Sequence, residues 1–146
     1  MLDYRAMTEA DLDPIMAIEE VIYTYPWTRG NFTDTLRAGG HGWIMTLSGV
    51  PVGYAVLSTG AGEAHLLNIS VAAAWQRRGF GRELLAYVIE RARVMEFTAI
   101  FLEVRASNTG ALVLYCKMGF SRIGVRKGYY PAPVGREDAI VLQYQP

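Results

Sequence analysis

A basic, glycine-containing turn between two apolar segments is the feature of this sequence most typical of ligand binding. The turn Gln76–Gly81 follows the apolar run Val71–Trp75 and precedes an amphipathic segment that begins at Arg82. A helix that begins in such a turn presents backbone N–H groups without acceptors, and its dipole adds partial positive charge. Glycines also let the backbone approach a ligand closely. The pattern predicts a phosphate or pyrophosphate site; a basic turn that only caps a surface helix is the alternative.

The spacing of the glycines excludes two common nucleotide-binding loops. No Lys-Ser or Lys-Thr pair follows a glycine, as a P-loop requires, and Leu84 stands where the dinucleotide fingerprint needs its third glycine. The hydroxyl that would bind magnesium is also absent. What remains is Gln/Arg-x-x-Gly-x-Gly, which resembles the pyrophosphate loop of the Gcn5-related N-acetyltransferases (GNAT), which cradles coenzyme A.

A single acid stands within an otherwise apolar segment. Glu103 lies inside Ile100–Val104, a segment expected to be a buried strand. A carboxylate in apolar surroundings holds a proton more readily than one in water, so it can act as a general base near neutral pH. An ion pair with an arginine such as Arg105 is the alternative that the residues alone leave open.

Hydrophobic periodicity and turn residues predict the elements that must position these groups. Strands are expected at Leu2–Ala6, Trp43–Leu47, Val52–Leu57, Ala64–Val71, Ala99–Val104, Phe120–Val125 and Ala139–Tyr144. Helices are expected to begin at Thr8 or Asp11 and at Thr28, and to cover residues 79–95 and 109–118, the last with Asn108 as its cap. A long loop is expected over Lys127–Asp138. The order β-α-α-β-β-β-α-β-α-β-β predicts an α/β domain with a mixed sheet and helices on its faces.

Composition bounds the remaining possibilities. The 146 residues suit one domain over the whole chain, and 51% are hydrophobic. Net charge is zero, which argues against nucleic-acid binding through bulk positive charge. The one cysteine, Cys116, excludes an internal disulfide, and we expect it to be buried. His41 and His65 lack metal-ligand spacing, so no metal is expected. Without a signal-like start or an apolar run of ~18 residues, we expect a cytoplasmic protein with no membrane partner.

Longer motifs extend the resemblance over nearly the whole chain. They are Pro26-Trp27, Leu67–Val71, Leu102-Glu103-Val104-Arg105-Ala106-Ser107-Asn108, Gly128-Tyr129-Tyr130-Pro131 and Gly135-Arg136-Glu137-Asp138-Ala139-Ile140. Together with the glycine turn, they resemble the bacterial ribosomal-protein alanine N-acetyltransferases, the RimI group. Ala73 and Trp75 depart from this family, which often has proline and tyrosine there. The entry to the loop could therefore be less rigid and hold coenzyme A more weakly.

The resemblance implies acetyl transfer from acetyl-CoA to the α-amino group of a protein N-terminus. The family's best-known acceptor is the N-terminal alanine of the eighteenth protein of the small ribosomal subunit, and neither a metal nor an acyl-enzyme is involved. Glu103 would be the general base. Tyr115 would be the general acid that protonates the departing thiolate, unless it is only a core aromatic. The alternatives are transfer to a small-molecule amine, to lysine or to other protein N-termini, and a non-catalytic acyl-CoA sensor.

The same resemblance implies how the two substrates are held. Backbone groups of Ile69, Ser70 and Val71 would pair with pantetheine, and Asn108 would bond to it as well as cap its helix. Pyrophosphate would lie on the amides of Arg77, Arg78, Gly79, Phe80, Gly81 and Arg82. Because long loops are often functional, the peptide groove is expected beside Tyr129, Tyr130, Arg136, Glu137 and Asp138, whose alternative role is to brace the loop.

Overall fold

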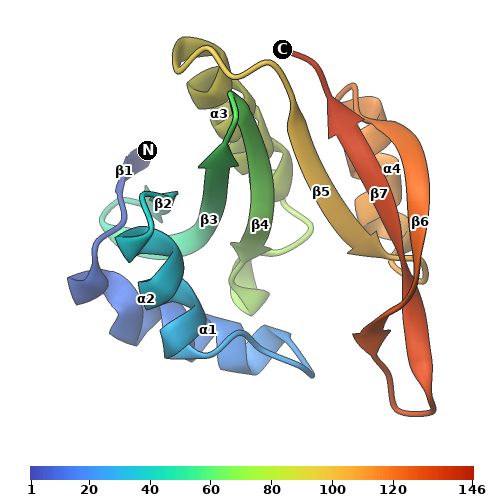
Figure 1. Cartoon of the computed structure of the whole chain (residues 1–146). Coiled ribbons are helices and arrows are strands. Elements are labelled where there is room, and N and C mark those ends of the chain that lie inside the picture. Colours follow the sequence, from blue (N-terminus) through green and yellow to red (C-terminus); the bar gives the residue numbers. More distant parts are fainter.

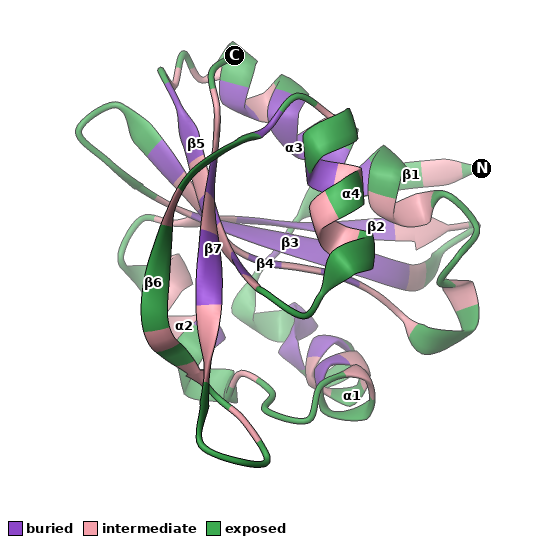
Figure 2. Ribbon diagram, turned by 90° about the vertical axis from the view of Figure 1, so that its right-hand side faces the viewer, coloured by how far each residue is buried: buried purple, intermediate pink, exposed green.

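The computed structural model describes residues 1–146 and contains one seven-stranded sheet with helices on both faces (Figures 1 and 2). The strands are β1 (Leu2–Ala6), β2 (His41–Leu47), β3 (Val50–Gly60), β4 (Glu63–Val71), β5 (Ile100–Arg105), β6 (Ser121–Pro131) and β7 (Arg136–Tyr144). The α-helices are α1 (Leu12–Ile22), α2 (Arg29–Arg37), α3 (Phe80–Val94) and α4 (Thr109–Lys117), and short 3-10 turns cover Glu9–Asp11 and Ala73–Trp75. The predicted order of elements and the mixed sheet are confirmed.

The sheet is split at its one parallel pairing. Its strand order is β1-β2-β3-β4-β5-β7-β6, and every neighbouring pair except β4–β5 is antiparallel. The pairing of β4 with β5 involves only Ala64 with Ile100 and His65 with Phe101. Beyond these residues the two strands separate, as Figure 1 shows. The edge of β4 that faces β5 is therefore free from Leu66 onward.

A bulge in β4 changes which residues face each side of the sheet. Val56 of β3 is opposite Asn68, whereas the next residue, Leu57, is opposite Leu66, so Leu67 has no partner. An extra residue of this kind bends a strand and reverses its alternation. Leu66 consequently packs in the core under α3, while Asn68 turns to the opposite face and donates a hydrogen bond to α1.

Two apolar cores hold the layers together. The larger lies between the sheet and α3, whose predicted stripe Leu84, Leu85, Val88, Ile89 and Ala92 is buried. The smaller lies between the sheet and the helices α1 and α2. A fully buried leucine contributes about 1.5–3 kcal/mol to the free energy of folding, so these two cores hold the helices on the sheet. Figure 2 shows the buried residues along the central strands.

The expected long loop over Lys127–Asp138 is wrong, because most of it is a β-hairpin. β6 and β7 extend to Pro131 and Arg136, and only residues 132–135 connect them. Gly128 adopts φ 59° in an irregular stretch of β6, and its N–H donates to the Asp138 carboxylate at 2.9 Å. Glycine and proline suggested a loop, whereas side chains of β7 hold this stretch in the sheet.

Cys116 also differs from the expectation. It lies in α4, as predicted, but it is exposed instead of buried.

Candidate active site

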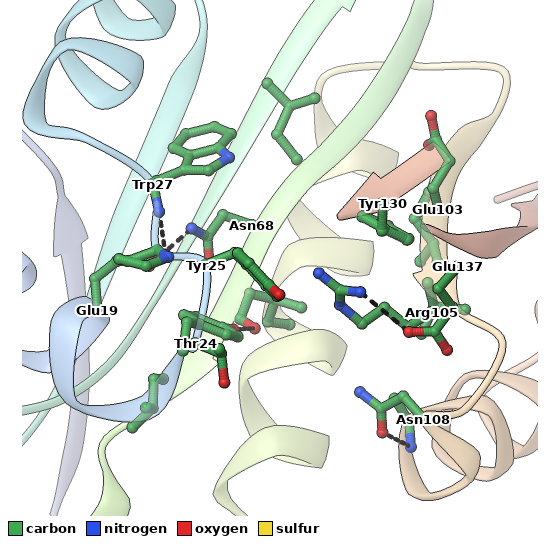
Figure 3. Close-up of a pocket in the computed structure, with 18 of the residues that line it drawn as sticks. Glu19, Thr24, Tyr25, Trp27, Asn68, Glu103, Arg105, Asn108, Tyr130 and Glu137 are labelled. Carbon is green, nitrogen blue, oxygen red and sulfur yellow. Dashed lines mark hydrogen bonds and ion pairs between the residues drawn. The ribbon is translucent and has the colours of Figure 1, made fainter. Parts of the chain in front are cut away.

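The separation of β4 from β5 opens a cavity of about 870 Å³. One wall is formed by α1, the segment after it and β4; it includes Glu19, Trp27 and Asn68. The opposite wall comes from β5, the start of α4 and the β6–β7 hairpin (Figure 3). Both Glu103 and Tyr115 line this cavity, so the fold brings the two proposed catalytic side chains to one space.

Glu103 lies two residues beyond the last β4–β5 pair, where the strands begin to separate. Its side chain is only 6% exposed. The carboxylate contacts the His65 ring through Oε2, and its Oε1 lies 3.7 Å from the Arg126 Nε. Arg105 is not its partner. The negative charge of this carboxylate is thus partly neutralised. The group is almost shielded from solvent and lies at the edge of the cavity.

Tyr115 presents a free hydroxyl to the cavity from an otherwise buried ring. The residue is 8% exposed and packs edge-on against Phe120, with ring centroids 5.6 Å apart. The hydroxyl makes no hydrogen bond within the chain. Every side-chain oxygen that is shut off from solvent does have a partner, so this unpartnered oxygen must reach the open space of the cavity. Burial raises the pKa of Tyr115 above its ordinary value of 10.0. The phenol therefore stays protonated at neutral pH, as a general acid must.

The free edge of β4 offers backbone groups to a ligand in the cavity. The Ala72 N–H bonds to the Val52 carbonyl of β3, so alternation directs Ile69 and Val71 away from β3 and toward the split. The Tyr23 hydroxyl donates to the Ile69 carbonyl at 3.3 Å. The Gln76 amide donates to the Val71 carbonyl at 2.9 Å. The N–H groups of Ile69 and Val71 are left for an extended partner, whereas the backbone of Ser70 faces β3.

The turn before α3 has the geometry of an anion site. The first hydrogen bond of the helix runs from the Glu83 N–H to the Gly79 carbonyl, so the amides of residues 77–82 have no acceptor in the chain. Arg77 and Gly79 adopt φ values of 62° and 83°, which turn successive N–H groups outward. Arg78 lies over the Trp75 ring at 5.3 Å. Arg77, Arg78 and Arg82 are exposed and form no ion pair.

Asn108 caps α4, as predicted, by accepting a hydrogen bond from the Ala111 N–H at 3.2 Å. It also lines the cavity, and its side-chain NH₂ group makes no hydrogen bond within the chain. The cap therefore leaves donors available to a ligand.

Of the residues expected at a peptide groove, Tyr130 and Glu137 line the cavity, and Tyr129, Arg136 and Asp138 do not. The Arg136 guanidinium donates to the carbonyls of Gly128 and Tyr129, and Asp138 also holds the hairpin. These two residues brace the hairpin from within.

Glu137 and Tyr130 surround Arg105. The Glu137 carboxylate accepts from the Ser107 N–H at 2.8 Å and from Arg105 at 3.0 Å. The Ser107 side chain and amide, followed by Arg105, lower the pKa of Glu137. Burial, followed by the Glu103 carboxylate, raises the pKa of Tyr130 to about 12. The Arg105 guanidinium lies over the rings of Tyr130 and Tyr25, at 4.6 and 5.3 Å, and so bridges the two walls of the cavity.

Sequence reasoning missed the buried carboxylate of Glu19. This side chain of α1 is 2% exposed and accepts hydrogen bonds from the Tyr54 hydroxyl at 2.6 Å, the Trp27 N–H at 2.9 Å and the Asn68 amide at 3.0 Å. It fixes the segment after α1 against the sheet. A signal was present, because Glu19 recurs at helical spacing with Leu12 and Ile15 and so falls on the buried face of α1.

Comparisons with known proteins agree with this geometry. Residues 12–120 match the acetyltransferase (GNAT) family. The chain is 34% identical over 137 residues to the [ribosomal protein bS18]-alanine N-acetyltransferase of Escherichia coli, covering 94% of this chain and 93% of that protein. The Haemophilus ducreyi enzyme of the same name is 33% identical over 94% of this chain and 96% of its own length. The crystal structure of the ribosomal-protein-S18-alanine N-acetyltransferase from E. coli superposes with a TM-score of 0.94 at 32% identity, over 99% of this chain and 94% of that one. None of the helices has the length and apolar character needed to cross a membrane.

Proposed function

The chain belongs to the acetyltransferase (GNAT) family, and from this premise we propose that it acetylates protein N-termini with acetyl-CoA as donor. The proposed acceptor is the N-terminal alanine of ribosomal protein bS18, the protein named for relatives that are 33–34% identical. The observation that carries the proposal is that Glu103 and Tyr115 line one cavity where β4 and β5 separate. Action on a ribosomal protein would place the enzyme in the cytoplasm.

The residues present fit coenzyme A. The unpaired amides of residues 77–82, with the unpaired arginines beside them, match the two negative charges of a pyrophosphate. The backbone of Ile69 and Val71 and the free NH₂ group of Asn108 match the amides of a pantetheine arm. Acetyl-CoA would supply the acetyl group as an activated thioester.

The charges that line the cavity suit an amino terminus. The side chains that line the cavity include three carboxylates, those of Glu19, Glu103 and Glu137, and one guanidinium, that of Arg105. This excess of negative charge attracts an α-ammonium group. An α-amine has an ordinary pKa of about 7.7–8.0, so it needs to lose only one weakly held proton before it can attack a thioester.

Two side chains would carry the proton transfers. Glu103 would take the proton from the α-amine, directly or through one water molecule. Tyr115 would hold a proton at its hydroxyl for the sulfur that leaves. Each transfer of this kind contributes roughly 10²- to 10⁴-fold to a rate. The walls of the cavity supply the rest by holding amine and thioester together.

Release of free CoA with a panel of short peptides tests this function. A peptide that begins with alanine and contains an internal lysine should give a kcat/KM at least about tenfold above peptides that begin with leucine or methionine. The same alanine peptide with its α-amine blocked should release no CoA, although its lysine is still free. Equal release from the blocked peptide would make the chain a lysine acetyltransferase instead.

A further inference from the structure

Glu103 faces a difficulty that the cavity does not solve by itself. A general base must return its proton to water before the next turnover, and the Glu103 side chain is only 6% exposed. During catalysis the cavity would also hold acetyl-CoA and a peptide, which exclude water from that side. The proton therefore needs an exit through a neighbouring group.

The contacts of Glu103 leave one neighbour able to accept that proton. Arg126, whose Nε lies 3.7 Å from the carboxylate, is always protonated and has no free acceptor. Tyr130 interacts with the Glu103 charge, but it has a pKa of about 12 and so already carries its proton. His65 contacts Oε2 through its ring Nε2, and a neutral imidazole nitrogen can accept a proton.

His65 faces a second cavity, distinct from the one proposed to hold the substrates. This cavity has a volume of about 370 Å³ and is lined by Ser58, Thr59, Gly60, Glu63, Ala64, His65, Phe101, Glu103, Arg126 and Val141. His65 lines only this cavity, whereas Glu103 lines both. The His65 side chain is 36% exposed, so its ring reaches solvent. The Glu103 carboxylate thus lies between the cavity proposed for the substrates and the second cavity, on which His65 lies.

We propose that His65 is a positioning and proton-relay residue that returns the proton of Glu103 to solvent through the second cavity, a role that rests on the proposed function of Glu103. Glu103 takes one proton from the acceptor amine. The His65 Nε2 takes it from the carboxyl group, and the imidazolium releases one proton to water or to a buffer base. The neutral ring then donates its Nε2–H to the Glu103 carboxylate, and exchange with solvent moves this proton from Nε2 to Nδ1 before the next transfer. The charged groups around the ring are Glu103 on β5, Arg126 on β6 and Glu63 on β4.

Three variants separate relay from structural support. His65→Ala removes the ring and leaves room for a free imidazole, and His65→Gln keeps a hydrogen-bond donor to Glu103 without a proton acceptor. His41→Gln is the matched control, because His41 stacks on Trp43 and lines neither cavity. Initial rates of CoA release are measured against the concentration of imidazole and of other buffer bases. The acceptor is whichever peptide or amine in the panel the wild-type chain turns over fastest.

We expect kcat to fall roughly tenfold or more in both His65 variants, with the KM for acetyl-CoA unchanged. In His65→Ala, added imidazole should restore most of the rate, and His41→Gln should match the wild type. Wild-type rates in both His65 variants would overturn the relay, as would a loss in His65→Ala that no buffer base restores. A wild-type chain that acetylates other amines but no alanine peptide would contradict the proposed acceptor and leave the relay to be judged on those amines.

Discussion

Replacement of Tyr115 by phenylalanine separates chemistry from stability unusually well. The hydroxyl has no partner within the chain, so its removal orphans no buried group, and the ring keeps its edge-on contact with Phe120. The cost in unfolding free energy should therefore stay below about 1 kcal/mol. Loss of a general acid costs roughly 10²-fold or more in kcat, which corresponds to about 2.7 kcal/mol of transition-state stabilisation.

Tyr54→Phe is the matched control with the opposite expectation. The Tyr54 hydroxyl donates to the buried Glu19 carboxylate at 2.6 Å. Hydrogen bonds to charged groups contribute about 1.5–3 kcal/mol, so this variant should lose that much unfolding free energy. Tyr54 does not line the cavity, so the variant should keep much of its turnover at a temperature where it is folded.

The assay combines CoA release, urea unfolding and calorimetric titration with acetyl-CoA. Because burial raises the pKa of Tyr115 above 10.0, the wild-type rate should show no loss of this acid between pH 7 and about pH 10. Tyr115→Phe should bind acetyl-CoA as the wild type does and turn over far more slowly. A kcat within twofold of the wild type would refute the assignment of Tyr115 as the acid.

The remaining predictions concern the base, the anion site and the hairpin. Glu103→Gln should lower kcat roughly 100-fold with the Kd for acetyl-CoA unchanged; unaltered turnover would remove the base. Gly79→Ala, at φ 83° with open space around its Cβ, should weaken acetyl-CoA binding in calorimetry through backbone strain of about 1–2 kcal/mol, whereas Gly49→Ala, at φ 84° in a distant turn, should not. Since the pKa of Glu137 is lowered, the stability that its carboxylate gives the hairpin is fully present above the ordinary pKa of 4.5. This stability is lost as the pH falls below that value. Protection factors against hydrogen exchange should therefore fall in the β6–β7 hairpin on acidification, and Arg105→Gln should produce the same change at neutral pH; unchanged protection factors in both cases would contradict this prediction.

Much of the fold was readable because local signals agreed with the tertiary structure. The α3 stripe from Leu84 to Ala92 repeats at helical spacing, and the larger core buries it. Thr28 and Asn108 cap the helices predicted to follow them. Ser48 and Gly49, with φ values of 50° and 84°, form the tight turn expected between β2 and β3.

The hairpin was missed because distant side chains decide its structure. A short segment of sequence here predicts a loop, because it contains Gly128, Pro131, Pro133 and Gly135. Contacts across the hairpin, from Asp138 to the Gly128 N–H and from Arg136 to two carbonyls, stabilise strands instead. No pattern in the sequence predicts these contacts, because they depend on how β6 and β7 align with each other.

The candidate site shows the same division. Glu103 could be singled out because an acid in an apolar strand is unusual, yet its contact with His65 depends on the register of β4 against β5. Glu19 has the spacing of the buried face of α1, but it is polar, so a search for apolar residues at helical spacing passes over it. Arg105 meets Tyr25 and Tyr130 only because the cavity brings two walls together.

The position of the transferred acetyl group tests the central claim most directly. The chain is incubated with acetyl-CoA carrying a ¹³C label and with a peptide that begins with alanine and contains an internal lysine, and the product is fragmented by mass spectrometry. We predict one labelled acetyl group per peptide, on the α-nitrogen of alanine. A label found only on the lysine side chain, or an unlabelled peptide after prolonged incubation, would contradict the proposed function.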